Sequence, residues 1–280
     1  KTPMAVNSIN TNAQSLIALQ SLNLTNDQLS VTQKRVSTGF RVSDARDDGG
    51  AFAVAQSVKS DMAGVVAVSE QLGGVKGILE TTFAALSVVS DTMKQLRATL
   101  TRLADGAISS DQRTAYKEQY ELLAKQVKSF VEDASYNGRT LLSTVATSGG
   151  GNITAIRNEE GGLFTIEAVD GADLTLPLTG PTSAADAQSW IQTGGDFDDV
   201  DMEISKALNK FGAAMSFVEN QIGYNSKKLD SMSTGLGSLV DADLARESST
   251  LEALKVRQQL GVQTLGLANE GPQVLLGLFR

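Results

Sequence analysis

The side chains that could do chemistry in this sequence are mainly carboxylates, because its 280 residues include no histidine and no cysteine. The chain therefore cannot form a thiol nucleophile, an imidazole base, a disulfide or a histidine-ligated metal site. Its densest acidic group is Asp196, Asp198, Asp199 and Asp201. The glycine and the bidentate glutamate of a calcium-binding loop are absent from that register. We interpret these carboxylates as charges at a helix start, where they favour the positive end of the helix dipole.

Two further features resemble binding sites only superficially. Gly73, Gly74 and Gly77 follow no predicted strand, and Lys76 lacks the spacing of a phosphate-binding loop, so we expect these glycines to loosen a long helix. Trp190, the one tryptophan, could stack on a sugar, but packing inside its own small unit is the favoured interpretation. We therefore expect no catalytic residue, no cofactor, no metal site and no enzymatic activity.

The distribution of charge and apolar residues restricts the possible partners. Residues 143–201 hold ten Asp or Glu and one Arg, so the acidic excess behind the net charge of -8 lies in this segment. The rest of the chain is almost neutral, which suits helices that pack densely against copies of themselves. The sequence has no run of about 18 apolar residues and no basic start before an apolar core, so we expect neither membrane insertion nor a cleavable signal peptide. No nucleic-acid partner is expected either.

The strongest pattern in the sequence is a ladder of apolar or small residues near the C-terminus. Between Leu239 and Phe279 such residues recur at alternating steps of four and three. A period of about 3.5 residues held over this length is typical of a helix that buries one seam against another helix in a coiled coil. The ladder consists of Val240, Leu244, Leu251, Leu254, Gly261, Leu265, Ala268, Leu275 and Phe279, with Glu247, Gln258 and Pro272 as its off-pattern members.

The N-terminal helix is the expected partner of this seam. It carries Ile9, Ala13 and Leu16 and then, after a shift of one residue, continues at steps of seven. An amphipathic surface helix is the alternative, but the pattern is longer than such helices usually are. The predicted assembly interface consists of Ile9, Leu16, Leu22, Leu29, Val36, Leu244, Leu251, Leu254, Leu265, Leu275 and Phe279.

Between the terminal helices, the sequence predicts a core of long helices. The glycine-rich and charged segment 37–50 marks a joint, after which a long helix should run to Asp105-Gly106. Ser109 and Gln112 form a capping box that starts another helix, which should stop at Asn137-Gly138. The helical period resumes at Asp201, and a break at Gly235 and Gly237 should separate that helix from the C-terminal one.

Residues 143–199 differ from this helical pattern. Segments 153–157, 163–169 and 174–178 read as short strands, and Asp170-Gly171 reads as a hairpin turn. A short helix should follow over residues 183–192. The predicted fold class is therefore mainly α, with long terminal helices forming a coiled coil, an antiparallel helical core bundle and a small α+β insert.

Four motifs outside the insert resemble those of one family. They are NSINTN at 7–12 with Leu16 and Leu22-Asn23; RVSTGFRV at 35–42 with Ala45, Asp47 and Asp48; YNG at 136–138 with Leu141-Leu142; and QLGVQ at 259–263 with 268–269, 272–273 and 275–280. In this order they resemble the bacterial flagellins, over about residues 5–142 and 200–280. The insert carries no signal of that family.

The resemblance implies a structural subunit that self-assembles into the extracellular flagellar filament for swimming and is exported by the flagellar type III route. It implies as partners other subunits, a filament cap, hook-junction proteins and an export chaperone on the C-terminal helix. The implied parts are 1–44, the N-terminal inner-core helix; 45–142, the outer-core helices; 143–199, a variable surface-exposed insert; 200–236, the outer-core C-terminal helix; and 237–280, the C-terminal inner-core helix.

Two alternatives share some of these features. A hook-filament junction protein of the same superfamily has similar terminal helices, and a flagellin-like surface protein would use the insert to bind a ligand. Electron microscopy after nucleation with filament fragments separates the first alternative from a filament subunit, because a junction protein gives short capped structures instead of long tubes. A saturable, ligand-dependent change in Trp190 fluorescence would favour the second alternative.

Overall fold

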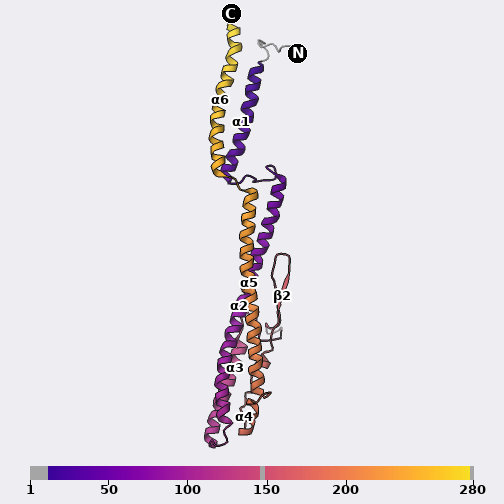
Figure 1. Ribbon diagram of the computed structural model, residues 1–280, viewed down its shortest axis with the longest axis vertical. Coiled ribbons are helices and arrows are strands. Elements are labelled where there is room, and N and C mark those ends of the chain that lie inside the picture. The colour runs from indigo at the N-terminus through magenta and orange to yellow at the C-terminus, as the bar shows by residue number, and fades with distance from the viewer. Residues whose placement is uncertain (1–11, 146–148, 278–280) are drawn as a thin grey trace. The chain divides into compact units, whose positions relative to one another are not determined.

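The computed structural model describes residues 12–145 and 149–277, with only the backbone of residues 271–277. Its helices are α1 (Ala13–Thr38), α2 (Gly49–Leu103), α3 (Ser110–Asp133), α4 (Ala184–Ile191), α5 (Asp196–Val240) and α6 (Leu244–Gly277), together with the short 3-10 helix η2 (Gly171–Leu174). Strands β1 (Ile153–Ile156) and β2 (Leu163–Ile166) form a two-stranded sheet (Figure 1). The mainly α fold with a small insert that contains strands is confirmed.

The chain divides into two compact units. We call residues up to 60 and from 231 onward the terminal unit, and residues 61–230 the core unit. The terminal unit therefore joins segments from the two ends of the sequence. Helices α2 and α5 contribute residues to both units.

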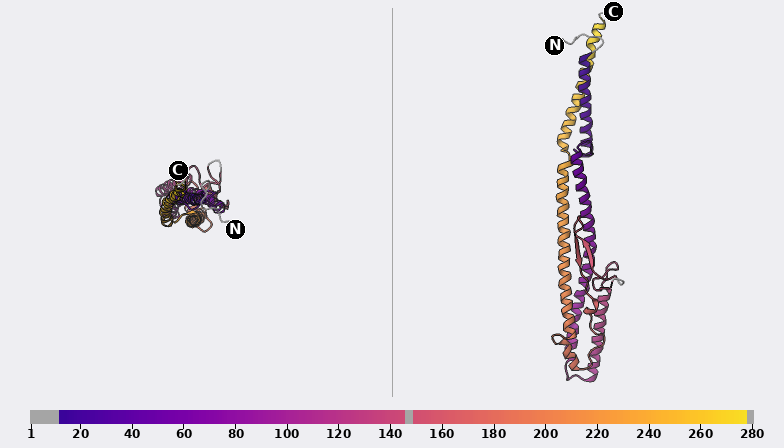
Figure 2. Two further views of the ribbon diagram at one scale, coloured as in Figure 1. Left: turned by 90° about the horizontal axis from the view of Figure 1, so that it is seen from above. Right: turned by 90° about the vertical axis from the view of Figure 1, so that its right-hand side faces the viewer.

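In the terminal unit, α1 and α6 lie side by side and run in opposite directions (Figure 2). Near one end of the pair, the side-chain amide of Asn12 donates a hydrogen bond to the carbonyl oxygen of Ala268 at 2.7 Å. Further along, Gln258 Nε2 donates to Asn26 Oδ1 at 2.7 Å. Because an early residue of α1 pairs with a late residue of α6, these bonds fix the antiparallel register. The predicted pairing of the two terminal helices is confirmed.

The joint after α1 is held by backbone hydrogen bonds to the last residue of α5 and to the segment that follows it. Gly39 ends α1 in the left-handed conformation, with φ of 76° and its N–H bonded to the Arg35 carbonyl. Phe40 then pairs with Asp241 in an antiparallel bridge. The N–H groups of Arg41 and Val42 both donate to the carbonyl oxygen of Val240, at 2.7 and 3.2 Å. These bonds tie the two chain segments together at the base of the helix pair.

The predicted break at Gly235 and Gly237 is wrong, because α5 continues through both glycines to Val240. A glycine inside a helix costs only about 1 kcal/mol relative to alanine, so helix continuity survives it. The break lies instead at residues 241–243. Asp243 caps α6 there, since its Oδ1 accepts from the N–H groups of Ala245 and Arg246 at 3.1 Å each.

The core unit is built on a continuous apolar cluster from α2, α3 and α5. The leucine residues of α2 at helical spacing are buried, whereas Phe83 is 38% exposed. The capping box of Ser109 and Gln112 is confirmed at the start of α3. Fully buried side chains of the cluster include Leu72, Leu79, Leu86, Leu96, Leu100, Tyr120, Val127 and Phe211.

Helix α3 ends at Asp133, before the predicted stop at Asn137-Gly138. Those two residues form a separate tight turn in which Asn137 and Gly138 have φ of 50° and 73°. The turn is closed by paired hydrogen bonds between Tyr136 and Arg139. Two successive positive φ values are typical of a hairpin turn rather than of a helix cap.

Gly77 in α2 does not loosen its helix as expected, and α2 is continuous through Gly73, Gly74 and Gly77. A Cβ atom at residue 77 would lie 2.9 Å from Cζ of Tyr136. The glycine therefore makes room for the tyrosine ring, which packs directly on the helix backbone.

In its described residues, the insert has two strands instead of the three that were predicted. β1 and β2 pair antiparallel, with Ile153 opposite Ile166 and Ile156 opposite Leu163. The predicted strand 174–178 is wrong, and so is the predicted hairpin at Asp170-Gly171. Asp170 instead caps η2, because its side chain accepts from the Ala172 N–H at 3.0 Å. An aspartate before a glycine suits a short helix cap as well as a hairpin.

Some residues of the segment 143–199 also contribute to the apolar core. Ile166, Leu174, Leu176 and Phe197 are all at most 3% exposed and belong to the main apolar cluster. Helix α5 begins at Asp196 rather than Asp201, so Phe197 lies in its first turn.

Helix α2 is the one helix in the described part of the chain that is long and apolar enough to cross a membrane by length and composition alone. Its best 18-residue window has a mean hydropathy of 1.3. This criterion uses length and average composition and not an unbroken apolar run, so the absence of membrane insertion stays a prediction. A third of that window is buried inside the protein, and core helices of water-soluble proteins pass the same test.

Candidate assembly interface

The seam of α6 follows the pattern read from the sequence. In residues 244–270, the partly or fully buried positions are Glu247, Leu251, Leu254, Gln258, Gly261, Leu265 and Ala268, and all of them belong to the predicted ladder. Every other position in this range is exposed, including Leu244, which also belongs to the ladder. The repeat of about 3.5 residues therefore identifies the face of α6 that contacts α1.

The seam of α1 differs from the prediction in its first turns. Ser15, Ala18, Leu22, Thr25, Leu29, Thr32 and Val36 are its partly or fully buried positions at the expected helical spacing. Ala13 and Leu16 are exposed, so the predicted shift of one residue before Leu22 is wrong. The buried face of α1 keeps one helical register along its length. In the first turns, small or hydroxyl side chains lie on this face where leucine was expected.

Thr25 and Thr32 are fully buried seam residues that sequence reasoning missed, as it also missed Ser15 and Ala18. The hydroxyl of Thr25 donates to the carbonyl oxygen of Ser21 at 2.9 Å, so burial leaves no unpaired donor. A count of apolar side chains alone could not find them. Their spacing of seven residues, in phase with Ala18, is the signal that a pattern search allowing threonine would use.

The eleven predicted interface residues have different surroundings. Leu22, Leu29, Val36, Leu251, Leu254 and Leu265 are partly or fully buried in the terminal unit, whereas Leu16 and Leu244 face solvent. Leu275 lies in α6 where only the backbone is described, and Ile9 and Phe279 lie outside the described residues. The structure thus brings together those predicted residues that lie in the central parts of α1 and α6.

Charged side chains reinforce the base of the helix pair. Arg35 on α1 donates to Glu247 on α6 at 3.1 Å. Lys34 forms ion pairs with Asp44 and Asp47, each at 2.9 Å. The Lys34 ammonium and the Ser43 N–H lower the pKa of Asp47 to about 2. Hydrogen bonds from Arg46 and Lys34 hold the pKa of Asp44 well below its ordinary range. Asp44 and Asp47 therefore stay ionised to a lower pH than an ordinary aspartate.

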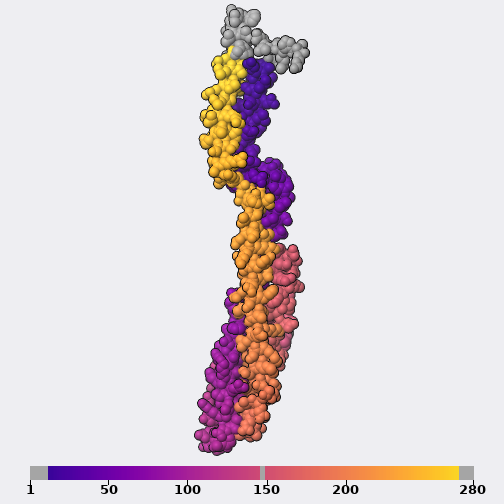
Figure 3. All heavy atoms as spheres, in the orientation of Figure 1, coloured from indigo at the N-terminus to yellow at the C-terminus, as the bar shows by residue number. Residues whose placement is uncertain are grey.

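Both helices also expose apolar side chains outside the seam. These side chains are 42% to 68% exposed and comprise Leu16, Ile17, Leu19, Leu24 and Val31 on α1, and Leu244, Val256, Leu260, Val262 and Leu267 on α6. A helix that is apolar on all sides is normally buried, and large exposed apolar surfaces mark interaction sites. Figure 3 shows α1 in indigo and α6 in yellow packed against each other, with broad outer surfaces left over.

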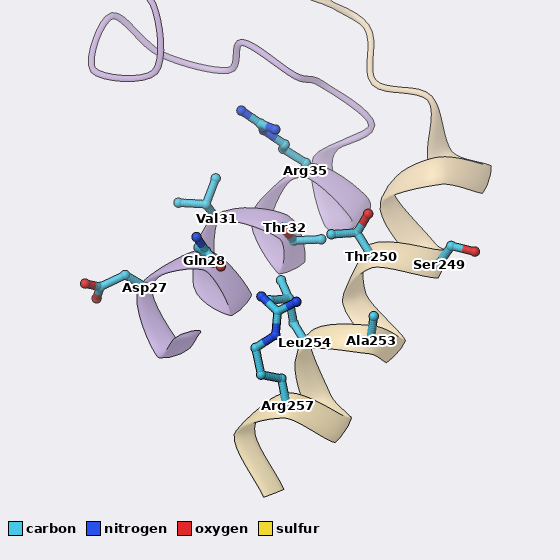
Figure 4. A pocket seen from close by; sticks show the side chains of 10 residues that line it. All are labelled: Asp27, Gln28, Val31, Thr32, Arg35, Ser249, Thr250, Ala253, Leu254 and Arg257. Carbon is cyan, nitrogen blue, oxygen red and sulfur yellow. The ribbon is translucent and has the colours of Figure 1, made fainter. Parts of the chain in front are cut away.

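An open groove of about 600 Å³ lies between α1 and α6. Figure 4 shows the ten side chains that line it, five from each helix. Thr32 and Leu254, each 5% exposed, are its buried residues. The groove lies on the same two helices as the exposed apolar residues.

The carboxylates and the tryptophan considered as candidate site residues have structural roles instead. Asp196, Asp198 and Asp199 lie in the first turn of α5, as expected for charges at a helix start. Trp190 is partly buried, with its ring centroid 5.8 Å from that of Tyr120. In the described part of the chain, no group of three or more carboxylate side chains has an arrangement that could hold a metal ion.

Comparison with known families gives two matches, one at each end of the chain. Residues 9–147 match the family model described as "Bacterial flagellin N-terminal helical region". Residues 197–279 match the family model described as "Bacterial flagellin C-terminal helical region". The two matches together cover well over half of the chain and leave most of the insert unmatched.

Similar proteins are flagellins of comparable length. Flagellin FljK of Caulobacter vibrioides is 33% identical over 284 residues, which cover 99% of this chain and 100% of the relative. The flagellin of Brucella melitensis is 34% identical over 289 residues, which cover 98% and 99%. Among solved structures, a putative flagellar hook-associated protein from Vibrio parahaemolyticus has a TM-score of 0.56 and 12% identity, with coverage of 70% of this chain and 100% of that chain. At that identity the last similarity concerns the fold alone.

Proposed function

The chain belongs to the bacterial flagellin family and is a structural subunit of the extracellular flagellar filament, and from this premise we propose that its terminal unit makes the contacts between subunits. Flagellins polymerise with copies of themselves, so the filament requires self-complementary surfaces. The role is structural, and we propose that the chain has no enzymatic activity.

The observation that carries this proposal is the apolar surface of α1 and α6 outside their seam. A leucine, isoleucine or valine that moves from water into a packed interface contributes about 1.5 to 3 kcal/mol. Residues such as Leu24, Val256 and Leu267 therefore make burial between subunits favourable, while their exposure is unfavourable in an isolated chain.

The predicted interface residues divide into two roles under this proposal. Leu22, Leu29, Val36, Leu251, Leu254 and Leu265 hold the helix pair together, whereas Leu16 and Leu244 contact neighbouring subunits. Ile9, Leu275 and Phe279 extend the interface toward the chain ends. We propose the corresponding parts as 1–44 and 237–280 for the inner core, 45–142 and 200–236 for the outer core, and 143–199 for the segment facing outward.

Because the filament assembles outside the cell, the subunit must not polymerise through α6 before export. We propose the flagellar type III route, with an export chaperone that covers the apolar residues of α6. A filament cap and hook-junction proteins are the proposed partners at the two ends of the filament. The exposed apolar residues Leu260, Val262 and Leu267 support the chaperone proposal, because they offer a surface that a helical partner can bury.

The experiment that tests the subunit contacts replaces Leu24, which is exposed on α1 outside the seam. Leu24→Asp should leave the helix content of the free subunit unchanged and abolish seeded polymerisation, because a carboxylate in a dry interface loses its hydration. Leu24→Met is the matched control and should polymerise normally, since it keeps the apolar volume. Normal filaments from Leu24→Asp would show that this surface makes no contact between subunits.

A hook-filament junction protein is a second candidate, because the solved hook-associated protein shares the fold. That similarity, at 12% identity, concerns architecture alone, while the full-length relatives are flagellins. Electron microscopy of protein nucleated with filament fragments separates the two functions. Long tubes are expected of a filament subunit and short capped structures of a junction protein.

A further inference from the structure

The groove between α1 and α6 is lined by three charged side chains, and one of them already has a partner. Arg35 is bound to Glu247 at 3.1 Å. The other two are Asp27 on α1 and Arg257 on α6. Neither forms an ion pair with any residue in the described part of the chain, whereas Lys255 on α6 pairs with Glu252.

Asp27 and Arg257 carry opposite charges on the same groove but do not pair with each other. Figure 4 shows the Asp27 carboxylate at the rim, directed away from α6. An intrachain bond would require its side chain to turn back across the groove. One groove thus offers a carboxylate on one wall and a guanidinium on the other, both in reach of an approaching molecule.

We propose that this groove receives the terminal unit of a second copy of the chain, and that Asp27 of one copy pairs with Arg257 of the next. The inference rests on the proposed function, because it specifies how the terminal units contact one another. Because every copy carries both residues, two copies of the chain are enough to form the Asp27–Arg257 pair.

The geometry of such a pair suits a filament. In a head-to-tail contact, Asp27 of one subunit pairs with Arg257 of the next, and each subunit keeps one unused Asp27 or Arg257 for a further neighbour. Repetition of a head-to-tail contact that does not close gives an open helical array. The pairing therefore propagates as subunits are added.

The lining of the groove explains why the pair would matter. Thr32 and Leu254 are its buried residues, and Val31 stands beside them at 45% exposure. An apolar side chain of the second copy that fills this space removes water from the rim, which strengthens the attraction between carboxylate and guanidinium. The planar guanidinium can bind a carboxylate through two parallel hydrogen bonds, so the pair also sets the register of the copies.

Charge reversal tests the pairing directly. Asp27→Arg alone and Arg257→Asp alone should each raise the critical concentration for seeded polymerisation by about tenfold or more, because like charges then meet between copies. The double variant Asp27→Arg with Arg257→Asp should polymerise close to the original level. An equimolar mixture of the two single variants should also polymerise. In the mixture, the arginine introduced into one variant meets the aspartate introduced into the other, and the original Asp27 meets the original Arg257.

The mixture distinguishes pairing between copies from pairing within a copy, because an intrachain pair would be restored in the double variant and not in the mixture. Circular dichroism of each free subunit checks that helix content is unchanged. Failure of the mixture to polymerise, or normal polymerisation of both single variants, would overturn the proposal. Leu24→Asp in parallel separates the two levels: if it blocks assembly while both charge variants assemble normally, the subunit contacts stand and only the Asp27–Arg257 pairing fails.

Discussion

Gly261 of α6 lies directly against Leu22 of α1, so that a Cβ atom at residue 261 would be 3.2 Å from Leu22 Cδ1. Both residues belong to the seam, and the missing side chain lets the helices approach closely at this point. Gly266, further along α6, is exposed and has no atom within 4 Å of such a Cβ. The two glycines of the same helix therefore have different roles.

Gly261→Leu should weaken the pairing of α1 and α6, because a larger residue must displace Leu22, and overpacking of this kind costs about 1 to 3 kcal/mol. Gly266→Leu is the matched control, and it should strengthen α6 by up to about 1 kcal/mol, since leucine favours helix more than glycine does. Amide hydrogen exchange in α6 measures both effects. Equal protection in the two variants would show that the contact with Leu22 does not limit the approach of the helices.

The ladder of α6 could be read from the sequence because helical periodicity is a local property. The ladder positions between Glu247 and Ala268 lie on one face of α6 whatever residue type occupies them. Even the polar residue Gln258 is therefore correctly assigned to the seam. The start of α1 could not be placed in the same way. There the sequence favours Leu16 by hydrophobicity, while the packing buries Ser15 and Ala18, whose small side chains allow a close approach.

The insert shows a different limit of sequence reasoning. The apolar alternation over residues 174–178 coincides with burial of Leu174 and Leu176, although Leu178 is 38% exposed. It does not create a strand, because a strand requires a neighbouring chain segment to accept its hydrogen bonds, and that neighbour is set by the tertiary fold. The alternation alone therefore could not predict the secondary structure of this segment.

The ion pairs at the joint predict a specific effect of pH. Asp47 has an ordinary pKa of 3.8, which Lys34 lowers to about 2 together with the N–H and hydroxyl of Ser43. Because the pKa is lower in the folded state, the stabilisation is present above pH 3.8 and is lost as the pH falls through about 2. Lys34→Met should move the pKa of Asp47 back toward 3.8. Carbon-detected NMR titration of the side-chain carboxyl measures this shift.

Arg46→Met provides the control for that titration. Arg46 is the main cause of the lowered pKa of Asp44, so its removal should raise the pKa of Asp44 more than that of Asp47. An unchanged Asp47 pKa in Lys34→Met would show that the ion pair of 2.9 Å does not persist in solution.

The core role of the insert predicts a stability difference between two leucines. Leu174 is fully buried in the main cluster, and Leu163 at the start of β2 is 65% exposed. Leu174→Ala should destabilise the core unit by about 2 to 5 kcal/mol, through lost burial and the cavity left behind. Leu163→Ala should change the unfolding free energy by no more than about 0.5 kcal/mol. Urea unfolding followed by circular dichroism gives both values, and equal values would place the insert outside the cooperative core.

Removal of residues 261–280 tests whether the two units depend on each other. The main apolar cluster of the core unit includes no described residue of α6, so the core unit should keep its cooperative thermal unfolding. The early part of α1 should lose its partner, because Leu22 packs on Gly261 and Asn12 bonds to Ala268. Seeded polymerisation should be abolished, which sedimentation measures. Filaments of normal length from the truncated chain would contradict the assignment of subunit contacts to the terminal unit.

Leu265→Asp tests the same seam without shortening the chain. Leu265 is partly buried on the seam of α6, and the described seam residues around it offer no cation that could pair with a carboxylate. Burial of a carboxylate there is unfavourable, so the variant should lose protection from hydrogen exchange in α1 and α6 and should fail to polymerise. Gln263→Asp introduces the same charge at an exposed position of the same turn and should leave the protection of both helices unchanged. If the two variants lose protection equally, the effect comes from the added charge, and the seam is not the structural basis of the helix pair.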